Sequence, residues 1–328
     1  MNSTAQNVPL NSSRQVRLAT ANPNRFSRLF SAFGAAVLLT LSAAPLAALE
    51  PMVVAPEKSE VVARVNVAQA LQSPLSGMII DEYGRQNIES TAKLIQNLTD
   101  VNLFADLYEA WLFGQIDSDE EVLILARGQF NETKLVDLLR VNNTFKETTY
   151  LGETVYSWTD ENNLPRWAVF IGQYLAIGGT NEIIRGVVDR QNATTGGFQQ
   201  TPIAKALPQN LNRNDFWLVI SSERYRTIEF AAMAEAIDLK YLLLTASHTD
   251  ERVTVTGMAV PLNPEDTQEY KAIGDGALAL SRLMEDGNVF ARLAANTVTV
   301  TQEAEGVAAT AELSNAEALN LLYLIREY

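Results

Sequence analysis

The pattern of apolar and polar positions alternates along the chain between a period of two and a helical period. Residues 60–67 alternate, with Val61, Ala63 and Val65 on one side, which predicts a strand that places one face on a core. Residues 74–98 carry apolar side chains near helical spacing, and Gly84 is a possible break in that helix. Both periods in one chain predict the α+β class.

The rest of the first half continues this mixture. Asn131 can cap a helix over residues 131–141, and Gly152 provides the turn of a hairpin. The remaining expected elements are strands over 110–114, 121–126, 148–150 and 154–158, a second hairpin with a glycine turn over 167–177, and a helix over 180–191. Because these strands follow one another through short connections, we expect them to pair antiparallel.

Residues 192–214 interrupt both periods, and the pattern of the first half then recurs. The expected elements are strands over 216–221, 241–247, 253–260, 289–294, 297–302 and 308–313 and helices over 227–239, 263–284 and from 314 onward. We predict antiparallel sheets with helices packed on one face, in two similar halves, residues 49–192 and 215–328, joined by a linker over residues 193–214. The alternative is that the usual succession of strands and helices in an α+β protein gives the same element order without an internal repeat.

The first 48 residues have the order of a secretory signal peptide. Their four basic residues, Arg14, Arg17, Arg25 and Arg28, precede an apolar run from Phe33, and no acidic residue occurs before Glu50. We expect cleavage near Ala48 and a location in the periplasm or outside the cell of a bacterium. An uncleaved membrane anchor and an organelle transit peptide are the alternatives.

Charge and composition narrow the partners and the chemistry. Without the leader, 21 basic and 39 acidic residues give a net charge of −18, which disfavours nucleic acid and argues against stable membrane insertion after cleavage. With no cysteine and one histidine, the chain cannot form disulfides, thiolate nucleophiles or histidine-rich metal sites. We therefore expect no cofactor, and the partner is an unknown protein or envelope component.

Candidate chemistry is sparse, and we assign no catalytic, cofactor-binding or metal-ligating residue. The segment Ser247-His248-Thr-Asp250-Glu251 holds the residue types of a catalytic triad, but a triad gathers its members from separate segments. The acidic loop with Asp117, Asp119, Glu120 and Glu121 could bind a hard cation or could be solvated. We expect Trp111, Trp158, Trp167 and Trp217 to be mostly buried, with a surface strip for sugar or peptide as the alternative.

Residues 124–139, with the segment Arg127-Gly-Gln-Phe-Asn-Glu-Thr-Lys-Leu135, are followed by a hairpin that turns at Gly152. Together they resemble an uncharacterised family of exported bacterial proteins, and the resemblance covers roughly residues 58 to 192. It implies export and an α+β fold, and it implies no activity and no site residues.

We therefore expect an exported, non-enzymatic binding or structural protein of the cell envelope or extracellular space. The alternative is a carboxylate-based or metal-assisted periplasmic hydrolase. Several acidic side chains around one pocket would favour the hydrolase, and an exposed apolar patch or an open sheet edge would favour the binding protein.

Overall fold

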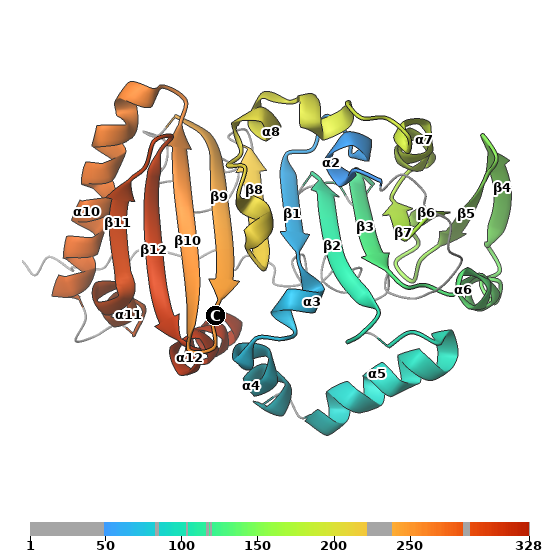
Figure 1. The fold of residues 1–328 in the computed structure, drawn as a ribbon, viewed down its shortest axis with the longest axis horizontal. Coiled ribbons are helices and arrows are strands. Elements are labelled where there is room, and N and C mark those ends of the chain that lie inside the picture. Colours follow the sequence, from blue (N-terminus) through green and yellow to red (C-terminus); the bar gives the residue numbers. More distant parts are fainter. Residues whose placement is uncertain are drawn as a thin grey trace, which may run out of the picture. The chain divides into compact units, whose positions relative to one another are not determined.

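The described residues form one sheet of twelve antiparallel strands (Figure 1). The strand order is β11-β12-β10-β9-β8-β1-β2-β3-β7-β6-β5-β4. The strand bounds are β1 (Val61–Val65), β2 (Leu107–Gly114), β3 (Val122–Gly128), β4 (Lys146–Tyr150), β5 (Glu153–Thr159), β6 (Pro165–Ile171), β7 (Tyr174–Gly178), β8 (Phe216–Ser221), β9 (Leu239–His248), β10 (Arg252–Pro261), β11 (Val298–Gln302) and β12 (Val307–Ser314).

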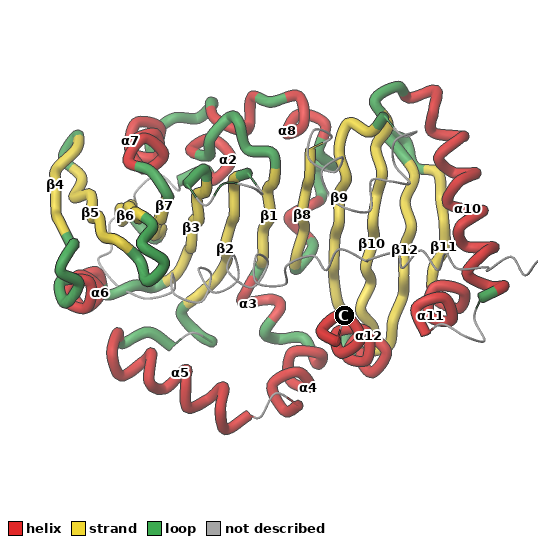
Figure 2. The backbone as a smooth tube through the Cα atoms, turned by 180° about the vertical axis from the view of Figure 1, so that it is seen from behind, coloured by secondary structure: helices red, strands yellow, loops and turns green. Residues whose placement is uncertain are grey.

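Helices precede, follow and connect these strands (Figure 2). Their bounds are α2 (Pro51–Val54), α3 (Val67–Ala70), α4 (Pro74–Glu82), α5 (Arg85–Thr99), α6 (Glu132–Leu139), α7 (Asn181–Arg190), η1 (Gly197–Gln200), α8 (Pro202–Ala206), η2 (Leu211–Arg213), η4 (Pro264–Asp266), α10 (Thr267–Leu283), α11 (Val289–Thr297) and α12 (Asn315–Glu327).

This computed structural model describes residues 49–82, 85–102, 104–115, 118, 120–221, 238–284 and 289–327. They all lie in one of the two units into which the chain divides, residues 36–328. The leader over residues 1–48, Gly84 and most of the helix expected over 227–239 lie outside the described residues.

The first strands of the two predicted halves meet at the middle of the sheet. Strand β1 pairs with β8 in a register that places Ala63 opposite Leu218. Outward from this pair, the neighbours are β2, β3, β7 and β6 on one side and β9, β10, β12 and β11 on the other. The linker region between the halves forms the short helices η1, α8 and η2. A sequence repeat behind this order stays a prediction.

Adjacent residues of a strand point to opposite faces of the sheet, and β3 is apolar on both. Leu125 belongs to the cluster that packs against helices α2 and α7, and we name this side of the sheet the α7 face. Ala126 belongs to the cluster that includes Val136 of helix α6, and we name the opposite side the α6 face. Helices therefore cover both faces of the first half, where one covered face was expected.

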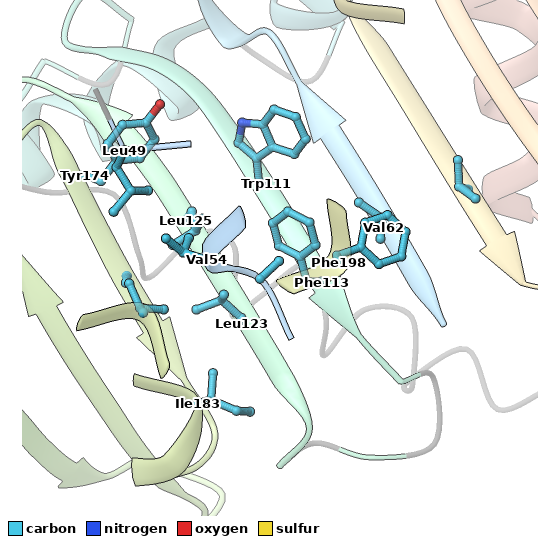
Figure 3. Packing of buried hydrophobic residues seen from close by; sticks show 14 of the residues in the cluster. Leu49, Val54, Val62, Trp111, Phe113, Leu123, Leu125, Tyr174, Ile183 and Phe198 are labelled. Carbon is cyan, nitrogen blue, oxygen red and sulfur yellow. The ribbon is translucent and has the colours of Figure 1, made fainter. Parts of the chain in front are cut away.

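The largest cluster of buried side chains lies on the α7 face (Figure 3). Trp111 and Phe113 of β2 stack with ring centroids 5.8 Å apart, and Phe198 of η1 packs against Phe113. Leu49 is 4% exposed and belongs to the same cluster. The core therefore begins with the first described residue, directly after the predicted cleavage region.

The second half places its described helices on the α6 face alone. Strand β10 points Val253 and Val255 toward helices α11 and α12 and points Thr254 and Thr256 to the α7 face. The Thr256 and Thr310 hydroxyl oxygens lie 3.0 Å apart on that face. This alternation is typical of a strand that is covered on one side.

The structure corrects one expected strand. Residues 289–294 were expected to be extended, but they form helix α11. Ala291 is buried, and Leu293 packs into a cluster on the α6 face. The run Ala-Arg-Leu-Ala-Ala favours a helix, and this preference outweighs the two β-formers Val289 and Phe290.

Candidate functional site

The segment around the single histidine does not assemble a catalytic triad. Ser247 and His248 are consecutive residues of β9, so their side chains point to opposite faces of the sheet. Asp250 and Glu251 are exposed in the turn that follows. The nucleophile, base and acid of a triad would have to converge on one reacting atom, and this segment spreads them apart.

The histidine has a partner that the sequence analysis missed. The Nδ1 atom of His248 lies 2.6 Å from Oδ2 of Asp215, with side-chain exposures of 15% and 11%. Asp215 immediately precedes β8, which pairs with β9. The contact follows from that pairing, and 33 residues separate the two in sequence. The pair ties the end of one strand to the start of its neighbour.

The acidic hairpin loop gives no cation site among the described residues. Asp117 and Asp119 lie outside them, and Glu120 and Glu121 are exposed at the start of β3. In the described part of the chain, no three histidine, aspartate or glutamate side chains gather closely enough to hold a metal ion.

Two of the four tryptophans belong to the core. Trp111 is 4% exposed and Trp217 is 1% exposed, and their rings meet edge to face with centroids 5.4 Å apart. Trp158 and Trp167 are partly buried on β5 and β6. The buried pair cannot contribute to a surface strip for sugar or peptide.

A buried group of charged side chains joins four strands on the α7 face. Arg64 of β1 donates from Nε and Nη2 to Oε2 of Glu109 on β2, at 3.1 and 2.9 Å. Oε1 of Glu109 accepts from Nε of Arg127 at 3.1 Å and from the Tyr174 hydroxyl at 3.3 Å. The side chains of Arg64 and Glu109 are each 9% exposed. We name these four residues the Glu109 cluster.

The Glu109 cluster fits a structural role better than acid–base chemistry. Both carboxylate oxygens of Glu109 accept hydrogen bonds from arginines of neighbouring strands. Burial, followed by the charge of Glu109, raises the pKa of Tyr174, so that hydroxyl stays protonated at neutral pH. The cluster therefore cross-links β1, β2, β3 and β7.

The outer side of helix α10 is the most exposed apolar surface of any described helix. Toward the sheet, α10 buries Thr267 and Tyr270 and places Gly274 against Val300 of β11. A helix turns by about 100° per residue, so Gly276 and Leu283 point almost directly away from the sheet. The four large apolar side chains on this side are Ile273, Leu280, Leu283 and Met284, with exposures of 46, 56, 83 and 50%.

Small residues fill the rest of this side. We name the following exposed residues the α10 outer face: Ala272, Ile273, Gly276, Ala279, Leu280, Leu283 and Met284. The charged side chains of Lys271, Asp275 and Arg282 lie together along one flank of the helix. One charged residue, Glu269, is exposed at the N-terminal end of this side, seven residues before Gly276. From Ala272 to Met284 the outer face itself is apolar, which is unusual for a helix side turned to water.

Two glycines of α10 differ in what surrounds them. A Cβ atom on Gly274 would lie 3.0 Å from Cγ1 of Val300, so this glycine lets the helix approach β11 closely. A Cβ atom on Gly276 would have no atom within 4 Å. Glycine costs roughly 0.5–1 kcal/mol relative to alanine inside a helix, and no contact among the described residues explains that cost at Gly276.

The sequence analysis placed a helix over residues 263–284 but did not identify this surface. The available signal was the apolar side chains around most of its circumference, which exceed what one packed side needs. Both views place α10 at the end of the sheet beside edge strand β11 (Figures 1 and 2). In that position, no described element covers the outer face.

Other exposed features are smaller or more polar. Helix α5 exposes Leu94 and Leu98 at 58% and 50%. Strand β4 forms the opposite edge of the sheet, and its Lys146 and Glu147 oppose addition of another strand. Among the described helices, none combines the length and the hydrophobicity needed to span a bilayer.

Comparisons with known proteins add little. No protein-family model matches the chain, and a search of curated proteins found no match. Among solved structures, crystal forms III, I and IV of TP0453, a Treponema protein, superpose with TM-scores of 0.49, 0.49 and 0.48 at 11, 12 and 10% identity. Each match covers 84% of this chain and 97 to 98% of the other. At these values the similarity gives no information about function.

Proposed function

We propose that this chain is an exported, non-enzymatic binding or structural protein of the bacterial envelope or extracellular space, and that the α10 outer face is its contact surface. The observation that carries the binding role is this largely apolar side of a surface helix. Four large apolar side chains there are each 46% or more exposed, and contiguous exposed apolar surface marks interaction sites.

Export is supported by the leader and by where the core begins. Cleavage near Ala48 would leave Leu49 and helix α2 in place, and α2 is well anchored. Arg190 donates from Nε to the Val53 carbonyl at 3.1 Å and from Nη2 to the Val54 carbonyl at 2.9 Å. The resemblance of residues 58 to 192 to exported bacterial proteins agrees with this route.

The hydrolase alternative has no such support in the described residues. Among the carboxylates there, the pKa shift that is resolved belongs to Glu317, and it is downward. A general acid would need a raised carboxyl pKa or a closely paired carboxylate. The hydrolase is therefore kept as one outcome of the experiment described below.

The test has two parts, export and binding. The full chain is expressed in a bacterium, and the periplasmic and extracellular fractions are analysed by intact mass. We expect a product that starts near Leu49. A chain that keeps Met1 and stays in the cytoplasm would contradict export.

For binding, the processed protein is compared with its Leu280→Asp variant in capture from an envelope extract, and both are assayed on polysaccharide and ester substrates. We expect α10-dependent capture and no turnover. Turnover of a substrate by both proteins would favour the hydrolase.

A further inference from the structure

We infer that α10 is a self-association helix, whose outer face binds the same face of a second copy of this chain with the two helices antiparallel. The inference rests on the proposed function, because it names the partner of the surface proposed there. The observation that selects a second copy is the order of charges along α10.

The charges of α10 are self-complementary in the antiparallel direction. Asp275 and Arg282 are both exposed and stand seven residues apart, so two helical turns bring them to the same flank. In an antiparallel copy that order is reversed. Asp275 then faces the partner's Arg282, and Arg282 faces the partner's Asp275, which gives two opposite-charge contacts about one two-fold axis.

The existing bond of Asp275 is compatible with this pairing. Lys271 donates from Nζ to Oδ2 of Asp275 at 2.6 Å along the same helix. A carboxylate has about four lone-pair sites and can accept from two cations together. Each copy then contributes Lys271, Asp275 and Arg282 to the flank of the contact.

The same register brings apolar side chains of the two copies to the same level. When Asp275 faces the partner's Arg282, Ile273 lies level with the partner's Met284, and Leu280 lies level with the partner's Gly276 and Ala277. Gly276 has open space around it. A glycine there lets the partner's Leu280 approach the helix backbone, as a knob enters a hole between two helices. This supplies the close contact that the unit itself does not provide at Gly276.

Other occupants fit less well. A parallel copy would place the flank with Asp275 and Arg282 against the opposite, apolar flank of its partner, so neither charge would meet an opposite charge. An anionic lipid surface would be repelled by a mature chain of net charge −18. Each copy brings two basic residues and one acidic residue to the flank of the contact, so the overall negative charge of the chain is not concentrated there.

The contact is a single helix pair, so it is smaller than the interface of a permanent dimer. Interfaces of this size belong to weak or transient complexes. We expect a monomer–dimer equilibrium with a Kd in the micromolar range or weaker. The export route that we propose gives the chain an oxidising location, but with no cysteine no disulfide can supplement this contact.

The first test is sedimentation equilibrium of the processed full chain over a wide concentration range. We expect reversible dimerisation, weakened at least about 100-fold by Leu280→Asp, since a charge would be buried at the centre of the contact. Asp275→Arg should weaken it about tenfold. The double variant Asp275→Arg with Arg282→Asp restores opposite charges between copies and should regain most of the loss. Equal weakening by the single and double charge variants would overturn the antiparallel pairing.

The second test introduces single cysteines into this cysteine-free chain and measures disulfide cross-linking between copies. Ala279 lies next to the expected two-fold axis, so Ala279→Cys should form a disulfide with its own copy under mild oxidation. Ala272 is exposed on the same side but lies about two turns from Ala279, roughly 10 Å along the helix. Ala272→Cys should therefore remain unlinked in an antiparallel pair. Linking of both variants would indicate a parallel pair and overturn the proposal.

A monomer at all concentrations, with neither variant cross-linked, would overturn self-association. This result would leave the binding role standing if capture from the envelope extract still depended on Leu280. Absence of both self-association and Leu280-dependent capture would overturn the binding role as well. The two failures are therefore distinguishable.

Discussion

Helices α7 and α10 both border the sheet, yet they use their apolar residues in opposite ways. Helix α7 buries Ile183, Ile184, Val187 and Val188 at 8% exposure or less. Its exposed positions are the charged residues Glu182, Arg185 and Asp189. Helix α10 instead buries Thr267 and Tyr270 and exposes its large apolar side chains.

The difference shows that an apolar side chain on a helix need not belong to the core of its own chain. In α7 the apolar side faces a sheet that is apolar in return, and the charged side faces water. In α10 the sheet covers one narrow side of the helix, and a second, apolar side stays exposed. We therefore expect substitutions in the first half to affect folding, and substitutions on the α10 outer face to affect association.

The largest expected effect is at the Glu109 cluster in the first half. Glu109→Gln leaves Arg64 buried without its charged partner, which should cost about 3–5 kcal/mol of unfolding free energy. The matched control is Arg252→Gln in the second half, which removes an ion pair to Glu312 whose side chains are both 61% exposed. That change should cost less than about 1 kcal/mol. Urea denaturation measures both, and equal costs would contradict the difference in burial.

A somewhat smaller effect compares the two helices directly. Ile184→Ala on α7 removes a fully buried side chain and should cost roughly 2–5 kcal/mol. Leu280→Ala on α10 should change the stability of the dilute protein by no more than about 0.5 kcal/mol. Thermal unfolding at low protein concentration separates the two. A large loss from Leu280→Ala would place the α10 outer face in the core.

The two glycines of α10 sharpen the comparison further. Gly276→Ala should stabilise the dilute protein by about 0.5–1 kcal/mol, because alanine favours the helix and the space is open. Gly274→Ala should gain less or lose stability, because its Cβ would lie 3.0 Å from Cγ1 of Val300. Urea midpoints of the two variants measure the order, and a reversed order would contradict the orientation of α10.

The smallest effect concerns helix caps and pH. Hydrogen bonds from the Ser314 hydroxyl and backbone amide lower the pKa of Glu317 at the start of α12. The stability that Glu317 contributes is therefore present above the pKa of this carboxyl in the unfolded chain. It is lost as pH falls through the lower pKa of the folded state. Glu317→Gln should cost about 0.5 kcal/mol at pH 7 and should reduce the loss of stability in acid.

The matched control for this prediction is the cap of α7. The Thr180 hydroxyl accepts from the Ile183 amide, and no carboxylate takes part. Thr180→Ala should therefore lower the free energy of unfolding by about 1 kcal/mol. This loss should not change between pH 3 and 7. A pH-dependent cost at Thr180, measured by urea denaturation across that range, would contradict the assignment to Glu317.

Much of the fold follows from local patterns in the sequence. Alternation predicts β1 and the hairpins of both halves, and Asn131 and Thr180 are positioned to begin helices α6 and α7. Residues 289–294 show the limit of this approach, because Val289 and Phe290 favour a strand while the following residues favour a helix. A short segment of mixed preference is decided by packing, and Leu293 packs in a helix.

The candidate site was harder to predict because it depends on distant pairing. Arg64 and Glu109 are 45 residues apart, and His248 meets Asp215 through the register of β8 and β9. For α10, the sequence pattern predicts the helix but does not tell which apolar side the sheet covers. The packing of Gly274 on Val300 settles that point.

The most direct measurement is the urea midpoint of the processed full chain and its Leu280→Asp variant as a function of protein concentration. Dimerisation stabilises the folded state by mass action. We expect the midpoint of the native chain to rise with concentration, the variant's midpoint to stay constant, and the two to coincide at high dilution. A native midpoint that is independent of concentration, or a variant that is much less stable at high dilution, would contradict the assignment of the α10 outer face to a second copy.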